Sequence, residues 1–315
     1  MGKYICIRYG NVRYLVVILL LIPIAWTLWN LKKSVLSVPG RMGDRTLQHF
    51  RTKGSIHSDD ALSLQWYHAA NSRSKIADAL NSSAHMIEAD VLLRGRDPKE
   101  PIMAHPPETD SDITLRQWLK KVTMSDKGIK LDFKSLQAVA PSMSLLEEVK
   151  NRIEGPVWLN ADILPGPRGK AVHLDPVSFL KVVGSGFPQS VLSLGWTTHW
   201  DPDTDNPGYS WDMVREMEEV CRPLKQPVTF PVRAALLPQS FLQLHWLLQQ
   251  SNSYSLTVWT GSTDEWKVED LLPYRQNIDK SRIYYDLLEP QTLSIWLLNQ
   301  KAPDLHRWMD GLQFF

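Results

Sequence analysis

The sequence predicts an α/β protein whose body is a single (β/α)8 barrel of the TIM type, preceded by an amino-terminal membrane segment. From about residue 61, short apolar runs alternate with longer amphipathic runs, as strands alternate with helices. We count eight such strand-helix units, and eight units joined by right-handed crossovers form a barrel of ~250 residues. Polar residues also recur where the apolar runs end, which is where barrels of this type carry their functional groups.

The composition is that of an ordinary globular protein. The chain has 315 residues, of which 43% are hydrophobic and 22% charged, and this length suits either two domains or one large barrel. The formal net charge of +1 argues against a nucleic-acid partner, because proteins that bind nucleic acid usually have a strongly basic domain. Of the two cysteines, only Cys221 lies in the body, so no disulfide can form within it.

The amino-terminal region differs from the rest of the chain. Residues 14–29 carry no charge, and basic residues flank them on both sides. The run is slightly short for a spanning helix of ~20 residues and long for a signal-peptide core of roughly 7–15. We expect a short cytoplasmic amino terminus (1–13), a signal anchor (14–31) and a linker (32–60) before the barrel (61–315). The alternative is a cleaved signal peptide.

Both alternatives send the barrel into the secretory pathway. An uncleaved anchor gives a single-pass membrane protein with a lumenal or extracellular barrel, and cleavage gives a secreted one. The sequon Asn81-Ser82-Ser83 suits this location and makes Asn81 the expected glycosylation site.

The expected elements alternate in chain order. Strands are predicted at residues 63–70, 85–93, 128–134, 157–163, 190–196, 228–234, 255–260 and 282–286, and helices at 72–81, 114–123, 142–153, 176–183, 211–220, 238–250, 268–277 and 291–299. The run 101–105 is expected to be an accessory hairpin arm. Pro176 and Pro238 favour first helical turns. Pro231 lies inside a strand, where it removes a ladder donor, and we expect a bulge there.

Two carboxylates share one face of the second strand. Side chains at i and i+2 of a strand point the same way, so Glu88 and Asp90 project together while Ile87 and Ala89 face the other side. Clustered carboxylates are costly unless something compensates their charge. A divalent cation with oxygen ligands, Mg²⁺ or Ca²⁺, is the natural candidate, with Asp132 as a third ligand from the next strand.

Other polar residues end neighbouring strands. His68 follows the first strand and His105 follows the accessory arm, and either imidazole can transfer protons beside such a metal. Asn160 and Asp162 share one strand face. They either extend the polar rim or make a hydrogen bond within the barrel.

The same residues carry a resemblance. Five motifs resemble strand-end motifs of glycerophosphodiester phosphodiesterases and of the related PLC-like and sphingomyelinase-D-like barrels: Tyr67-His68, Ile87-Glu-Ala-Asp-Val91, Met103-Ala-His105, Leu131-Asp-Phe-Lys134 and Val258-Trp-Thr260. The body as a whole, roughly residues 60–315, is similar to the menorin family. Trp158–Gly166 and Asp112–Leu119 are part of that likeness.

The phosphodiesterase resemblance implies a role for each matching position. His68 and His105 would be the acid-base pair, Glu88, Asp90 and Asp132 the metal ligands, and Lys134 a phosphate contact, with Trp259 at the substrate. The pattern also departs from that family. Ala69 and Pro106 stand where the family has Arg and usually Asp, and Asp132 replaces the more usual Glu. Arg233, which ends the sixth predicted strand, is our candidate for the missing phosphate-binding guanidinium.

Two functions follow as expectations. The first is a metal-dependent phosphodiesterase that acts on a glycerophosphodiester or lysolipid-like substrate by histidine acid-base catalysis. The second, which the menorin resemblance favours, is a catalytically silent extracellular binding or adhesion protein with a protein partner. The retained carboxylates and imidazoles favour the enzyme, whereas Ala69 favours the binding protein.

Overall fold

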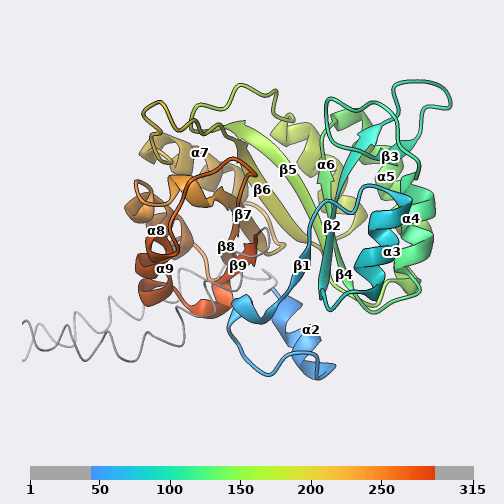
Figure 1. The fold of residues 1–315 in the computed structure, drawn as a ribbon, viewed down its shortest axis with the longest axis horizontal. Coiled ribbons are helices and arrows are strands. Elements are labelled where there is room, and N and C mark those ends of the chain that lie inside the picture. The colour runs from blue at the N-terminus through green and yellow to red at the C-terminus, as the bar shows by residue number, and fades with distance from the viewer. Residues whose placement is uncertain (1–43, 288–315) are drawn as a thin grey trace, which may run out of the picture. The chain divides into compact units, whose positions relative to one another are not determined.

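The computed structural model describes residues 44–287, which form an α/β barrel of mostly parallel strands (Figure 1). Eight strands lie side by side in the order β1-β2-β4-β5-β6-β7-β8-β9, each parallel to its neighbours. β3 (Pro101–Met103) pairs antiparallel with β2. The others are β1 (Trp66–Tyr67), β2 (Met86–Leu93), β4 (Gly128–Phe133), β5 (Val157–Pro165), β6 (Val191–Thr197), β7 (Val228–Arg233), β8 (Tyr254–Trp259) and β9 (Ile283–Asp286).

The predicted fold class is confirmed for this part of the chain. All eight expected strands are present in the expected order, and residues 101–103 form the accessory arm. No ladder joins β9 to β1 among the described residues, so the barrel is nearly closed. The predicted membrane segment and the helix predicted at 291–299 lie outside the described residues. Within residues 44–287, no helix is long and apolar enough to span a bilayer.

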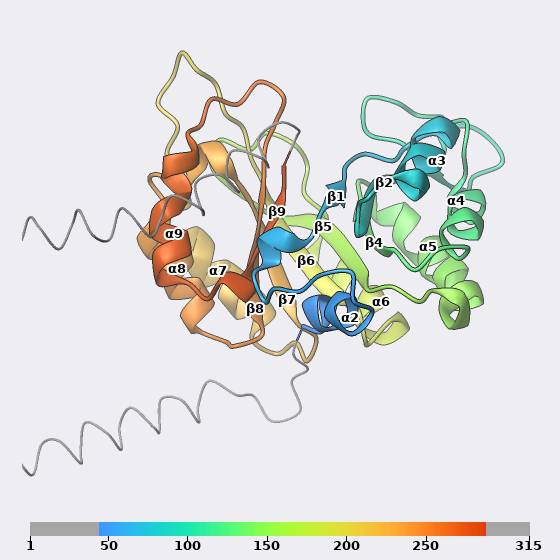
Figure 2. The same cartoon turned by 60° about the horizontal axis from the view of Figure 1, so that its bottom comes forward.

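Helices cover the outer face of the barrel (Figures 1 and 2). They are α3 (Arg73–Asn81), α4 (Leu115–Val122), α5 (Leu136–Val149), α6 (Pro176–Gly186), α7 (Trp211–Cys221), α8 (Phe241–Gln249) and α9 (Leu272–Asn277), with 3-10 turns at Ala61–Ser63, Lys150–Arg152, Ala234–Leu236, Val268–Leu271 and Lys280–Arg282. Side-chain caps fix several starts: Ser72, Thr114, Asp175 and Ser210 each accept a hydrogen bond from a backbone N–H in the first turn.

The strands bury apolar side chains outward and polar ones inward. Ile87, Ala89 and Val91 of β2 belong to the main core between the sheet and the helices. Glu88 and Asp90, which alternate with them, face the barrel interior together with their register partners Lys130 and Asp132 of β4. This alternation places the polar residues of successive strands in shared interior layers, and it is the reason why the candidate site forms inside the barrel.

A short helix closes the amino-terminal end of the barrel. α2 (Thr46–Thr52) buries Leu47 and Phe50 in a cluster with residues near the starts of the strands, including Trp158. The indole N–H of Trp158 donates a hydrogen bond to Thr46 Oγ1 at 3.0 Å. Figure 2 shows α2 below the strands. The expected linker therefore already has secondary structure from residue 46, because Leu47 and Phe50 bury enough apolar surface to hold the helix in place.

Three local expectations were wrong. Pro238 lies in the turn before α8, which begins at Phe241, and so is not in a first helical turn. α5 begins at Leu136, before Pro141, although we placed its start after that proline. Its buried residues lie on both sides of Pro141, so the packing outweighs the loss of one helical hydrogen bond. No bulge is found at Pro231 either: the pairs between β6 and β7 end at Thr229, and Pro231 keeps its register with Thr257 of β8.

Candidate functional site

A cavity of about 430 Å³ opens at the carboxyl ends of the strands and gathers most of the predicted site residues. Nine of the predicted residues line it: His68, Glu88, Asp90, His105, Asp132, Lys134, Asn160, Asp162 and Trp259. They come from the strands β2, β4, β5 and β8 and from the loops that follow β1, β3 and β4. The prediction that His68, Glu88, Asp90, His105 and Asp132 converge at one end is confirmed.

Three carboxylates meet at the centre of this cavity. Glu88, Asp90 and Asp132 each place one oxygen within 4.8 Å of the others. Glu88 and Asp90 are only 1% and 5% exposed, so water does little to screen their repulsion. Burial raises the pKa of Glu88 to about 7. The charge of Asp90 adds to this shift, so the charged form of Glu88 is disfavoured here.

The loop that follows β1 wraps over these carboxylates and orients two of them. Ala69 has a φ of 55°, an unusual left-handed conformation for a residue other than glycine. Its N–H donates to Glu88 Oε2 at 2.7 Å. Asn71 donates from Nδ2 to Asp90 Oδ2 at 2.7 Å and accepts from the Asp90 N–H at 2.9 Å. These bonds hold the loop in its strained form and fix the Asp90 carboxylate.

Lys134 partly neutralises the cluster. Its Nζ lies 2.6 Å from Asp132 Oδ2 and 3.3 Å from Asp90 Oδ1. Burial alone would lower the pKa of Lys134, but the two carboxylates outweigh it and raise that pKa. Burial would likewise raise the pKa of Asp132, yet Lys134 and Lys130 hold it below its ordinary value. Lys134 therefore bridges two of the three proposed ligands in this structure.

His68 is held by two carboxylates through the same ring nitrogen. Its Nδ1 lies 3.2 Å from Asp286 Oδ1 and 3.2 Å from Glu88 Oε2. Asp286, whose pKa is lowered, is ionised and can only accept a hydrogen bond, so Nδ1 carries a proton and the other nitrogen, Nε2, takes part in neither contact. Asp286 first, and then Glu88, raise the pKa of His68 to about 10.

Sequence reasoning missed two buried residues behind His68. Asp286, the last residue of β9, is 2% exposed, and Lys130 of β4 is 4% exposed. Lys130 Nζ donates to Asp286 Oδ2 at 3.1 Å and lies over the Trp66 ring. Burial would raise the pKa of Asp286, but Lys130 and His68 hold it well below its usual range. A charged Asp286 can therefore anchor the His68 ring.

The sequence left open whether Asn160 and Asp162 extend the polar rim or make a hydrogen bond within the barrel, and the two residues differ in this respect. Asn160 is buried, accepts a hydrogen bond from the Ser193 hydroxyl and hydrogen-bonds Asp132, so it belongs to the barrel interior. Asp162 lines the cavity, and burial raises its pKa to about 7 against the opposing charge of Lys134. Its register partner is Gly195, where a Cβ atom would lie 2.5 Å from Asp162 Oδ1.

The remaining predicted residues lie at or beyond the rim. His105 is exposed, and its Nδ1 donates to the Pro106 carbonyl at 2.6 Å. Trp259 lines the cavity, but Arg233 does not: its guanidinium pairs with Asp264 and lies over the Trp259 ring. The structure thus does not bring the proposed phosphate fork into the site. Asn81 is exposed at the end of α3.

The donor set fits a hard divalent cation. Three converging carboxylates offer oxygen ligands, and no contact described for residues 44–287 uses Oε1 of Glu88. Five carboxyl groups line the cavity (Glu88, Asp90, Asp132, Asp162 and Asp286) against Lys130, Lys134 and the His68 imidazolium. If all of these are ionised and His105 is counted without charge, two negative charges remain in excess. One divalent cation would balance them.

The body of the chain is similar to known proteins. Residues 60–292 match the model of the menorin N-terminal domain. The human protein named FAM151B is 56% identical over 255 residues, which cover 80% of this chain and 92% of the human protein. The family model covers the described barrel from residue 60 onward, and so includes every residue of the site above. This chain therefore belongs to the menorin family.

Proposed function

We propose that the barrel is a metal-dependent phosphodiesterase that acts on a glycerophosphodiester or lysolipid-like substrate. The observation that carries the proposal is the convergence of Glu88, Asp90 and Asp132 within 4.8 Å in a cavity that is also lined by His68, whose Nδ1 is held by Asp286 and Glu88. Carboxylate ligands favour Mg²⁺ or Ca²⁺ over zinc. When bound, such a cation stabilises the negative charge that develops on the phosphoryl oxygens.

The chain's own residues then supply binding and proton transfer. Because Nδ1 of His68 is committed to Asp286 and Glu88, His68 exchanges protons with the substrate through Nε2. His105, which also lines the cavity, is the second group of the acid-base pair. Its Nδ1–H is likewise committed, to the Pro106 carbonyl, so it too presents Nε2. Lys134 and Asp162 lie where the phosphate and the hydroxyl groups of the substrate would bind.

A second function, a silent binding protein, has one specific observation in its favour. The barrel supplies no guanidinium to the described cavity: Ala69 stands directly after His68, and Arg233 is paired with Asp264. Arginine binds phosphate with a planar fork that lysine does not reproduce. In that case the pocket would serve recognition of an extracellular partner, and Lys130, Lys134 and the His68 imidazolium would compensate the buried carboxylates without a metal.

Hydrolysis of a panel of glycerophosphodiesters and lysophospholipids distinguishes the two functions. We expect turnover by the purified full-length protein in Mg²⁺ or Ca²⁺, loss of turnover in a chelator, and a loss of at least ~100-fold in His68→Ala, because general acid-base catalysis contributes about that much. His57→Ala removes an exposed imidazole outside the cavity and should have no effect. Metal binding without turnover on any substrate of the panel would favour the binding protein.

A further inference from the structure

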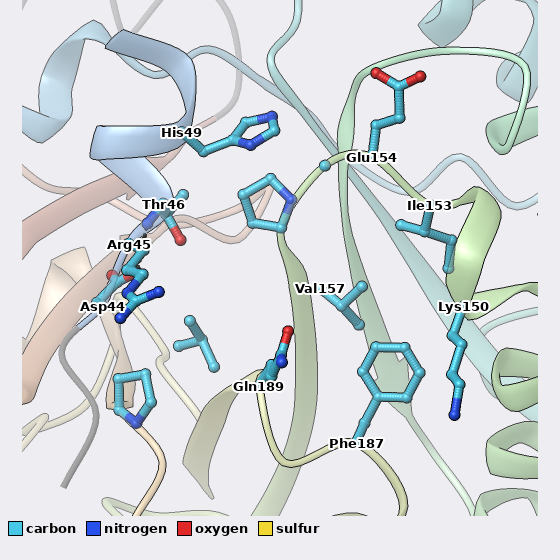
Figure 3. Close-up of a pocket in the computed structure, with 14 residues that line it drawn as sticks. Asp44, Arg45, Thr46, His49, Lys150, Ile153, Glu154, Val157, Phe187 and Gln189 are labelled. Carbon is cyan, nitrogen blue, oxygen red and sulfur yellow. Dashed lines mark hydrogen bonds between the residues drawn. The ribbon is translucent and has the colours of Figure 1, made fainter. Parts of the chain in front are cut away.

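A second cavity, of about 340 Å³, lies at the amino-terminal end of the barrel (Figure 3). It is lined by α2 and the residue before it, by the segment from Lys150 to Val157, and by the segment from Phe187 to Val191, with Pro227. Val157 and Val191 are the first residues of β5 and β6, whereas the candidate active site lies where the strands end. The two cavities share no lining residue, so a ligand here would be separate from the proposed chemistry.

All but one of the charged side chains of Asp44, Arg45, Lys150 and Glu154 in this cavity form an ion pair or a hydrogen bond. Asp44 accepts hydrogen bonds from the Thr46 N–H at 2.8 Å and from the Tyr284 hydroxyl at 2.5 Å. Glu154 pairs with Lys53 at 2.6 Å, and Lys150 pairs with Glu147. Within the part of the chain that the structure describes, the Arg45 guanidinium has neither an ion pair nor a hydrogen bond. Arg45 thus leaves one uncompensated positive charge.

The imidazole of His49 adds no charge to this cavity. Burial, and then the charge of Lys53, lower the pKa of His49, so the ring is neutral near pH 7. The Gln189 side chain has no hydrogen-bond partner among the residues 44–287. Figure 3 shows Gln189 near the middle of the lining residues, Arg45 to one side of it and Glu154 and Lys150 to the other. The lining groups left without a partner among these residues therefore include the Arg45 guanidinium, which is charged, and the Gln189 amide.

Apolar side chains form the rest of the wall. Phe187, Val157 and Ile153 line the same cavity and lie on the other side of Gln189 from Arg45 in the view of Figure 3. A cavity of this volume is at the lower end of the range for small-molecule sites, which are mostly apolar with a few placed polar groups. An arginine fork binds carboxylate or phosphate through two parallel hydrogen bonds. Charge and wall chemistry together select an anion with a compact apolar body.

We propose that this cavity binds a small amphiphilic anion, whose carboxylate or phosphate pairs with Arg45 and Gln189 and whose apolar body packs on Phe187 and Val157. Binding requires both the charged head group and the apolar body of the ligand. Arg45 is exposed and the apolar wall is small, so neither would hold a ligand by itself. The ligand is distinct from a phosphodiester substrate, since its binding needs neither the carboxylate cluster nor a metal.

Ligand-observed NMR on the full-length protein tests the proposal with four probes. These are 3-phenylpropionate, phenyl phosphate, acetate as the head group alone and benzyl alcohol as the body alone. We expect saturable binding of one or both aryl anions and much weaker binding of the other two. The better of the two aryl anions identifies the head group as carboxylate or phosphate.

Two variants on α2 and the residue before it form a matched pair. Arg45→Gln removes the guanidinium of the cavity and should weaken aryl-anion binding by about tenfold or more, as expected for a charge-assisted pair. Arg51→Gln makes the same charge change at an exposed arginine that lies outside this cavity and pairs with Asp59, and binding should not change. Arg45 makes no side-chain cap on α2, so its loss should leave the melting temperature unchanged.

Three results would overturn the proposal: no saturable binding of either aryl anion, equal weakening in both arginine variants, or weakening by Asp90→Asn. Weakening by Asp90→Asn would locate the anion in the candidate active site, at the carboxyl ends of the strands. Phe187→Ala is an additional check, because it should weaken the aryl anions without changing the affinity for acetate. Failure of the phosphodiesterase proposal alone would leave all of these results unchanged.

Discussion

Binding of Mg²⁺ or Ca²⁺ at the carboxylate cluster should release protons, and the amount follows from two buried carboxyls. Burial raises the pKa of Glu88 to about 7 and that of Asp162 to about 7. At pH 7 each group therefore holds about half a proton in the metal-free protein. A cation favours the ionised form of both groups, so we expect about one proton to be released per ion. The release should rise toward roughly two protons at pH 6 and fall toward zero at pH 8.

Calorimetry in two buffers with different ionisation enthalpies measures this release directly. At pH 7 the apparent binding enthalpies should differ by about the difference in buffer ionisation enthalpy, which corresponds to about one proton. Asp162→Asn keeps the three proposed ligands and should reduce the release to about half a proton. Asp203→Asn, at an exposed loop position, is the control. An enthalpy that is the same in both buffers, with the metal bound, would refute the assignment of protons to these carboxyls.

Three further predictions concern the network around the site. Asp286→Asn should lower the pKa of His68 from about 10, because Asp286 is the largest cause of that shift, and an NMR titration of the imidazole measures it. In a chelator, the free energy of unfolding should fall as the pH rises from about 5 to 7, since folded Glu88 still holds a proton that the unfolded chain has lost; Glu88→Gln should remove up to ~3 kcal/mol of this fall in denaturant titrations. Gly195→Ala should destabilise the barrel by ~1–3 kcal/mol, because its Cβ would lie 2.5 Å from Asp162 Oδ1, and thermal unfolding measures the loss.

The period of two along a strand predicted most of the site. It put Glu88 and Asp90 on one face, and the structure keeps both inside the barrel. The same rule places Lys130 on the face of Asp132, and the strand-end rule points to Asp286, so both missed residues had a signal in the sequence. Lys130 was overlooked because a lysine two residues before a proposed ligand resembles an ordinary exposed lysine. The burial of Lys130 depends on strands far away in the chain.

Contacts between distant loops were not predictable from the sequence. Arg233 ends β7 as expected, yet its guanidinium pairs with Asp264, which lies 31 residues away in the loop after β8. Asn71 fixes Asp90 from a loop without any periodic pattern. The start of α5 was misplaced for a related reason, because a local rule for Pro141 was outweighed by packing on both sides of it. Local patterns position side chains along an element, whereas partners across loops depend on the assembled barrel.

Direct measurement of divalent cation binding tests the central claim, that Glu88, Asp90 and Asp132 form one metal site. We expect the full-length protein to bind about one Mg²⁺ or Ca²⁺ and, at ~100 times the dissociation constant, to gain roughly 2.7 kcal/mol of stability, which raises the melting temperature by several degrees. Asp90→Asn should lose most of this gain, whereas Asp203→Asn should keep it. A wild-type melting curve that does not move at millimolar concentrations of either cation would contradict the account.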